Sequence, residues 1–130
     1  MILRKYAHTA IIVFIIYICL ITYLSLMPGA DEGGITDLEQ YGILFLDKIL
    51  HLGAYCCFIL LAHFIFVFHS HLFLFCAAIS FYGIAIEVIQ SLAVQGREGS
   101  CLDALSNILG VTLGYTIVLF YRRLSIVSIQ

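Results

Sequence analysis

The residues of this sequence best suited to chemistry lie where long apolar runs begin or end. Asp47, Lys48 and His51 open one such run, and Tyr55 follows one helical turn later. In a helix, Asp47, His51 and Tyr55 share one face, because residues four positions apart are neighbours. An imidazole beside a carboxylate suits a general base or a nucleophile. We therefore expect His51 to be catalytic, with Asp47 or Asp103 as the residue that orients it.

Two more polar pairs occur at the ends of the following apolar runs. Glu87 and Gln90 lie three residues apart at the end of one run. Asp103 and Asn107 lie four residues apart at the start of the last run. Each pair falls on one helix face. The pairs would add a partner acid and several hydrogen-bonding groups to a site built around an imidazole.

The face that carries Asp103 and Asn107 continues into Gly110 and Gly114. A glycine at every fourth position lets helix backbones approach one another closely within a membrane. The close-packed face and the polar face of this run therefore coincide. This coincidence predicts that the polar groups point into a helix bundle and not toward lipid.

The composition indicates what surrounds these residues. The chain has 130 residues, of which 63% are hydrophobic and 11% are charged. Soluble domains carry about 25% charged residues, and a soluble chain this short could not bury so much apolar surface. We therefore expect an all-α integral membrane protein.

Four apolar runs approach the length of about 20 residues that a membrane-spanning helix needs. We expect a bundle of four transmembrane helices in one domain, residues 1–130. The helices should cover approximately the ranges 7–27, 48–68, 71–92 and 103–121. The segment His69-Ser70-His71 interrupts the long central run and predicts a tight turn there.

The charges predict how the bundle is oriented. The chain ends carry basic residues, namely Arg4, Lys5, Arg122 and Arg123. Basic segments stay in the cytoplasm, so both termini are expected there. All eight acidic residues then fall at the outer side. In the longer outer loop, the capping box from Thr36 to Glu39 predicts a short helix on the membrane surface.

The antiparallel order of four helices brings the polar residues to one level. The second and fourth helices start at the outer face, and the third ends there. Arg97 lies in the short loop above them. A charge within a membrane helix costs roughly 2.5–3.5 kcal/mol on insertion scales, which makes these residues functional candidates. A structural alternative stays open, in which the charged residues cap helices or form ion pairs.

The order and spacing of these residues resemble the VanZ-like family of membrane proteins. The matching segments are Ser25-x-x-Pro28, Asp47-Lys48-x-x-His51-x-x-x-Tyr55, Glu87-x-x-Gln90, Arg97 and Asp103-x-x-x-Asn107-x-x-Gly110-x-x-x-Gly114. The resemblance implies a multi-pass protein of the bacterial inner (cytoplasmic) membrane, with unknown biochemical activity. The namesake of the family is linked to low-level resistance to teicoplanin, which acts on cell-wall precursors outside the membrane.

Three functions fit these observations. The first is an enzyme that hydrolyses or modifies an anionic lipid or a lipid-linked cell-envelope substrate. The second is a non-catalytic binding protein for a lipid headgroup, a cell-wall precursor or a glycopeptide antibiotic. The third is a small carrier or flippase that acts as an oligomer. For the enzyme, the expected catalytic residues are His51, Glu87, Asp103 and Asp47, and the expected substrate-binding residues are Lys48, Tyr55, Gln90, Arg97 and Asn107.

We predict no resident cofactor, although the Asp, His, Glu and Asn donors leave a divalent metal open. The expected partners are membrane lipids, and more specifically a lipid-linked cell-wall precursor or a glycopeptide antibiotic. No nucleic-acid partner is expected. The chain length leaves a homodimer open.

Overall fold

The computed structural model describes residues 7–28, 41–43, 45–65, 69–95 and 100–127. These residues form four helices and no strand, which confirms the predicted all-α class. The helices are α2 (Ala7–Leu26), α3 (Leu46–His63), α4 (His69–Ala93) and α5 (Cys101–Val127). Each is long and apolar enough to cross a membrane. Arg4, Lys5, the capping box from Thr36 to Glu39, and Arg97 lie outside the described residues.

Helix α3 ends five residues before its predicted end. It was expected to continue to about residue 68, but it ends at His63. The amides of Phe64 and Ile65 donate to carbonyls three residues back, at 3.2 and 3.0 Å. Such bonds tighten the last turn and satisfy carbonyls that the helix end leaves free. The predicted turn at residues 69–71 is wrong, because these residues form the first turn of α4.

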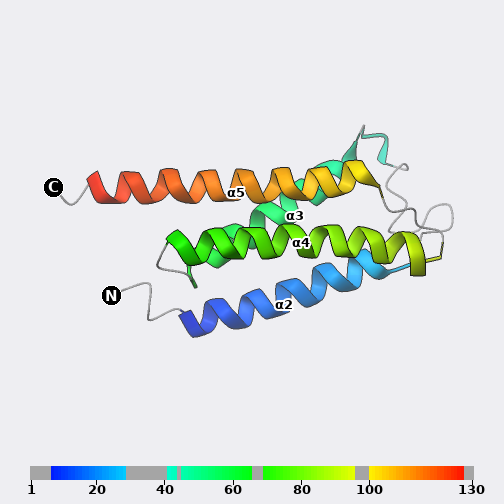
Figure 1. The fold of residues 1–130 in the computed structure, drawn as a ribbon, viewed down its shortest axis with the longest axis horizontal. Helices are drawn as coiled ribbons and strands as arrows, with labels where there is room; N and C mark the ends of the chain where they lie inside the picture. Colours follow the sequence, from blue (N-terminus) through cyan, green and yellow to red (C-terminus); the bar gives the residue numbers. More distant parts are fainter. Residues whose placement is uncertain (1–6, 29–40, 44, 66–68, 96–99, 128–130) are drawn as a thin grey trace.

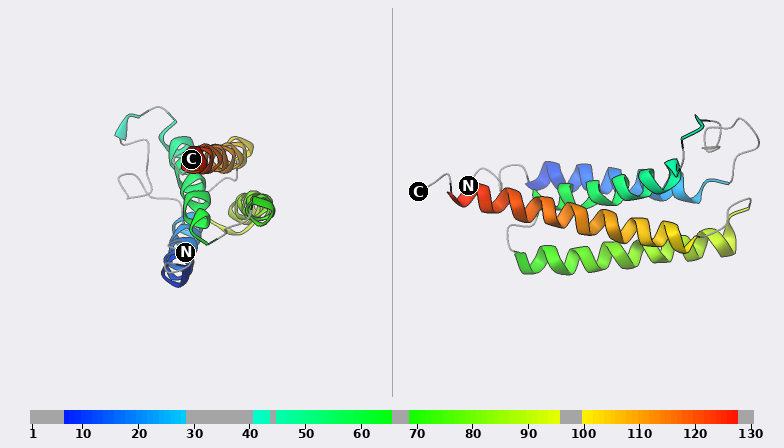
Figure 2. Two further views of the ribbon diagram at one scale, coloured as in Figure 1. Left: turned by 90° about the vertical axis from the view of Figure 1, so that its left-hand side faces the viewer. Right: turned by 90° about the horizontal axis from the view of Figure 1, so that it is seen from above.

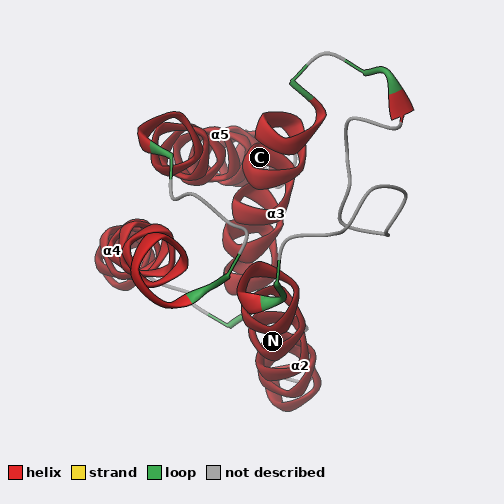
Figure 3. Ribbon diagram, turned by 90° about the vertical axis from the view of Figure 1, so that its right-hand side faces the viewer, coloured by secondary structure: helices red, strands yellow, loops and turns green. Residues whose placement is uncertain are grey.

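Helix α3 is the centre of the bundle. It contacts α2, α4 and α5, whereas α2 and α5 do not contact each other within the described part of the chain. The end views show α3 between α5 and α2, with α4 to one side (Figures 2 and 3). The start of α2 and the end of α5 lie at the same end of the bundle (Figure 1). The polar end is therefore the opposite one, where α3 and α5 begin and α4 ends.

The closest helix pair is α3 with α5. A Cβ atom added to Gly110 would lie 2.3 Å from the carbonyl oxygen of Leu52. A Cβ added to Gly114 would lie 2.8 Å from the carbonyl oxygen of Cys56. Only glycine allows the two backbones to approach this closely, which confirms the predicted close packing of this face.

Aromatic side chains fill the bundle below the polar end. Phe58 is fully buried, and its ring lies 4.8 Å from Tyr17, 5.5 Å from Tyr55 and 6.1 Å from Tyr82, measured between centroids. These contacts join α2, α3 and α4. The hydroxyl of Tyr17 donates to the carbonyl of Ala54 at 3.0 Å. The aromatic layer thus fixes α2 against α3 and α4, which contribute His51 and Glu87 to the polar end.

A second polar contact lies at the other end of the bundle. The Nε of Arg122 donates to the Nδ1 of His63 at 3.2 Å, and the His63 ring packs edge-on against Tyr121. His63 is buried, and its Nε2 has no hydrogen-bond partner among the described residues. This contact joins the end of α3 to the last part of α5.

Candidate functional site

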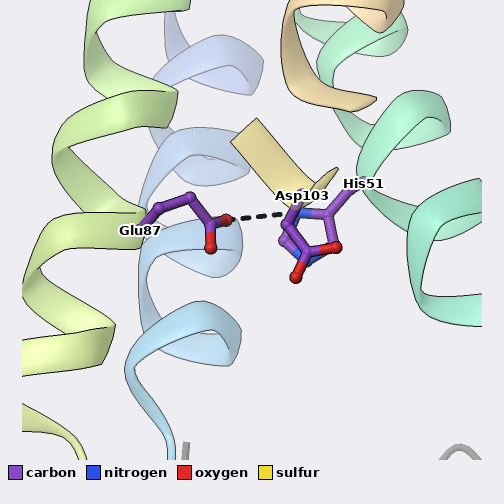
Figure 4. Close-up of side chains that lie close together, drawn as sticks. All are labelled: His51, Glu87 and Asp103. Carbon is purple, nitrogen blue, oxygen red and sulfur yellow. Dashed lines mark ion pairs between the residues drawn. The ribbon is translucent and has the colours of Figure 1, made fainter. Parts of the chain in front are cut away.

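Three helices bring their polar side chains together at the polar end of the bundle. His51 comes from α3, Glu87 from α4 and Asp103 from α5 (Figure 4). A ring nitrogen of His51, a carboxylate oxygen of Glu87 and a carboxylate oxygen of Asp103 lie within 4.8 Å of one another. Together with their neighbours they form the set that we call the polar cluster, which consists of Asp47, Lys48, His51, Glu87, Asp103 and Asn107.

Asn107 is the residue that holds the polar cluster together. It is completely buried, and its Oδ1 lies 3.0 Å from the Nδ1 of His51. Its Nδ2 donates to the Oε1 of Glu87 at 3.5 Å. An amide oxygen only accepts, so His51 must carry its proton on Nδ1 in this contact. The Nε2 of His51 is then the basic nitrogen of the ring.

Glu87 lies deep at the junction of α4 and α5, with 5% of its surface exposed. Its Oε2 accepts a hydrogen bond from the backbone N–H of Ser100 at 3.3 Å. Its Oε1 lies 3.7 Å from the Nδ1 of His51. The backbone N–H of Ser100 and the side-chain amide of Asn107 thus fix the Glu87 carboxylate. Figure 4 shows this carboxylate beside the imidazole of His51.

Lys48 lies between two carboxylates. Its Nζ is 2.6 Å from the Oδ1 of Asp103, and it also pairs with Asp47. The Asp103 residue is 8% exposed, and the ion pair with Lys48 is the close contact of its buried Oδ1. Asp47 is the outermost member, with 42% of its side chain exposed.

The structure changes the partner that sequence reasoning gave to His51. Asp47 or Asp103 was expected to orient the imidazole, but both carboxylates pair with Lys48, and the Nδ1–H of His51 donates to the Oδ1 of Asn107. Asn107 had been expected to bind substrate. The signal was present in the sequence, because an amide on the close-packed face of a helix is buried and requires a hydrogen-bond partner.

Gln90 and Tyr55 lie outside the polar cluster. Gln90 is 3% exposed, and its Nε2 donates to the carbonyl of Ser25 at 2.6 Å. Because α2 ends at Leu26, that carbonyl lacks a helical partner. Gln90 therefore ties the end of α2 to α4. Tyr55 is 2% exposed and packs within the aromatic layer, one turn below His51.

A hydroxyl contact below the cluster was not predicted from the sequence. The hydroxyls of Thr22 and Tyr82 lie 2.7 Å apart and join α2 to α4. Threonine and tyrosine are common in membrane helices, and nothing in their spacing indicates this pairing. Arg97, the remaining predicted site residue, lies outside the described residues.

The described polar cluster has an excess of negative charge. It holds three carboxylates, on Asp47, Glu87 and Asp103, and one ammonium, on Lys48. With all three carboxylates ionised and His51 neutral, its net charge is −2. Such a site attracts a cation, and it binds an anion only when additional positive charge is supplied.

The cluster therefore combines an oriented imidazole, a buried carboxylate and an ion-paired lysine at one end of a four-helix bundle. Comparisons with protein-family models, curated proteins and solved structures found no match to this chain. The resemblance to the VanZ-like family stays a prediction that rests on the motif residues.

Proposed function

We propose that this chain is a VanZ-like multi-pass membrane protein whose polar cluster hydrolyses or modifies an anionic lipid or a lipid-linked cell-envelope substrate at the outer membrane face. The observation that supports this most directly is the contact of His51 with fully buried Asn107, beside Glu87. It leaves the Nε2 of His51 as a base on a ring held in one orientation. General acid–base groups need that orientation before they need a tuned pKa.

In this proposal, His51 removes a proton from water or from an acceptor hydroxyl, and Glu87 receives or returns protons during the reaction. The side chain of His51 is 19% exposed, so the imidazole is accessible from the polar end. Lys48 and Arg97 are the cations expected to contact the anionic part of the substrate, and Arg97 adds positive charge beyond that of Lys48, which the cluster's own carboxylates already offset. Arginine suits bidentate contact with phosphate or carboxylate.

A binding protein without catalysis is the second candidate, with a lipid headgroup, a cell-wall precursor or a glycopeptide antibiotic as its ligand. The observation in its favour is the ion pairing of Lys48 with both Asp47 and Asp103. A paired lysine stabilises a preformed polar surface without any proton transfer. Within the described residues no contact favours the carrier, because Phe58, Ile59 and Ala62 are fully buried below the polar cluster and interrupt a polar path along α3.

Catalysis and binding respond differently to conservative substitutions. We expect His51→Gln and Glu87→Gln to reduce turnover by at least about 100-fold with little loss of affinity, because acid–base catalysis contributes about 10²–10⁴-fold. Arg97→Ala should mainly weaken binding. The assay incubates purified protein with labelled anionic lipids and lipid-linked wall precursors, and follows released or transferred groups and binding in parallel.

Ser106→Ala is the control, because Ser106 is a half-buried residue next to Asn107 in α5 and its hydroxyl donates to the carbonyl of Leu102 within that helix. It should leave turnover and affinity unchanged. If the wild-type protein binds one of these lipids and leaves it chemically intact over long incubation, the catalytic proposal is wrong and the binding function holds.

A further inference from the structure

We propose that His51, Glu87 and Asp103 bind a divalent transition-metal ion in the polar cluster. The three residues come from three different helices, and their candidate donor atoms lie within 4.8 Å of one another. One imidazole nitrogen and two carboxylate oxygens form a donor set that metal sites use. The inference concerns the same site as the proposed function, but it does not depend on catalysis.

The residues around the three donors are arranged as they are in metal sites. A metal-bound histidine donates its other ring N–H to an oxygen, which fixes the tautomer and the ring orientation. The Nδ1 of His51 has this contact with the Oδ1 of Asn107, so Nε2 is left with the lone pair. Glu87 is held in the same way by Asn107 and by the N–H of Ser100. Both side chains are therefore oriented before a metal arrives.

Charge is the second argument. The described cluster carries three carboxylates and one ammonium, a net charge of −2 with neutral His51. Uncompensated charge at the end of a membrane bundle is costly. One divalent ion brings the described cluster to neutrality. It also allows the phosphate of a substrate to approach groups that would otherwise repel it.

Asp103 supplies the third argument. Its buried Oδ1 has one close partner among the described residues, the Nζ of Lys48 at 2.6 Å. The ammonium of Lys48 thus occupies the place of a cation beside this carboxylate. A metal and Lys48 would compete for Asp103, and Lys48 could then pair with Asp47 alone.

The donor set selects the class of metal. Imidazole favours zinc and other transition metals over calcium and magnesium, which take oxygen ligands. Three protein ligands leave at least one position open for water or substrate, as in catalytic zinc sites. At metal–ligand distances of about 2.0–2.2 Å, tetrahedral donors lie about 3.4 Å apart. Binding should therefore draw the three side chains together by roughly 1 Å.

Metal binding to the full-length protein in detergent tests the inference. Protein stripped with a chelator is titrated with Zn²⁺ and Mn²⁺, and in parallel with Mg²⁺ and Ca²⁺. Stoichiometry is measured by elemental analysis after dialysis. We expect one Zn²⁺ or Mn²⁺ per chain and at least about tenfold weaker binding of that ion by His51→Ala, Glu87→Gln and Asp103→Asn.

Two variants separate a specific site from general attraction to negative charge. Asp47→Asn removes the same charge as Asp103→Asn from a carboxylate outside the three ligands, and should weaken binding less than about threefold because Asp47 is exposed and screened by salt. Lys48→Gln should bind the metal at least as tightly as wild type, because it removes the competing ammonium. Thermal unfolding of each metal-free variant verifies that it is folded.

Failure of the metal inference is distinct from failure of the proposed function. No bound metal in the wild-type protein, or equal losses for Asp47→Asn and Asp103→Asn, would overturn the metal site. Turnover that persists in the chelated protein would separate the reaction from the metal and overturn a catalytic role for it. A bound metal without any turnover would keep the site and end the catalytic proposal.

Discussion

At the residue scale, the polar cluster depends on one amide. Asn107 bonds to both His51 and Glu87 and is the only polar side chain in the described cluster with no exposed surface. A buried polar group that loses its partner costs about 1–3 kcal/mol. We therefore expect the cluster to be most sensitive to substitution of Asn107, although this residue carries no charge.

Asn107→Leu tests this dependence. Leucine keeps the branched shape of asparagine but leaves the Nδ1 of His51 and the Oε1 of Glu87 each without one partner. We expect a loss of about 2–4 kcal/mol in the free energy of unfolding, from two unsatisfied groups. Denaturant titration in detergent micelles measures it. Ser106→Ala should change the value by less than about 0.5 kcal/mol, and an equal effect of both substitutions would contradict the role of Asn107.

The convergence of His51, Glu87 and Asp103 was predictable from the sequence, and their hydrogen bonds were not. Helical spacing and an even number of antiparallel helices place the three residues at one level. Which neighbour each side chain contacts depends on how each helix is rotated about its own axis. A rotation smaller than the angle between successive residues is enough to change that contact. The bond of Gln90 to the carbonyl of Ser25 also requires the exact end of α2, which apolar composition does not mark.

At the element scale, the pairing of α3 with α5 positions the site. Gly110 and Gly114 seat α5 against the backbone of α3, directly below His51 and Asn107. The distance between these two side chains therefore follows from the distance between the two helices. The glycines were predictable as a packing face, because their spacing coincides with that of the polar residues.

Gly110→Ala should separate the helix pair. The new Cβ would meet the backbone oxygen of Leu52 at 2.3 Å, and backbone cannot rotate away as a side chain does. Overpacking of this kind costs about 1–3 kcal/mol. The matched control is Gly53→Ala in α3, where an added Cβ has nothing within 4 Å. We expect that control to be neutral or stabilising by up to about 1 kcal/mol, from helix propensity.

Thermal and denaturant unfolding in detergent compare the two alanine variants. Equal stabilities would show that α3 and α5 do not need their close approach.

The end of α3 is the part of this helix that sequence reasoning missed. Residues 64–68 are Phe-Ile-Phe-Val-Phe, so hydropathy continues past the point where the helix stops at His63.

At the scale of the whole molecule, the bundle has two different ends. The polar cluster lies where α3 and α5 begin, and the start of α2 and the end of α5 lie at the other end (Figure 1). The even number of helices was predictable from hydropathy and fixes this arrangement. Which end faces the cytoplasm is a prediction from the basic residues near the termini.

Reporter fusions test that orientation. When joined after Gln130, a reporter enzyme that works only in the cytoplasm should be active, and one that works only outside should be inactive. The reason is that Arg122 and Arg123 retain the end of α5 on the cytoplasmic side. The matched fusion is made within residues 29–40, between α2 and α3, and should be active only outside. The reverse pattern would place the polar cluster at the inner leaflet and contradict the proposed substrate access.

The shortness of the central helix has a consequence for the surrounding lipid. Lys48 and His63 mark two polar levels on α3, and the 15 residue steps between them correspond to a rise of about 22 Å. The hydrocarbon core of a typical bilayer is about 30 Å thick. If α3 spans such a bilayer, either the bilayer thins beside α3 or the polar cluster lies below the level of the phosphates. Thinning would bring lipid headgroups to the depth of the cluster, and a lipid substrate would then reach it by lateral diffusion within the leaflet at the polar end.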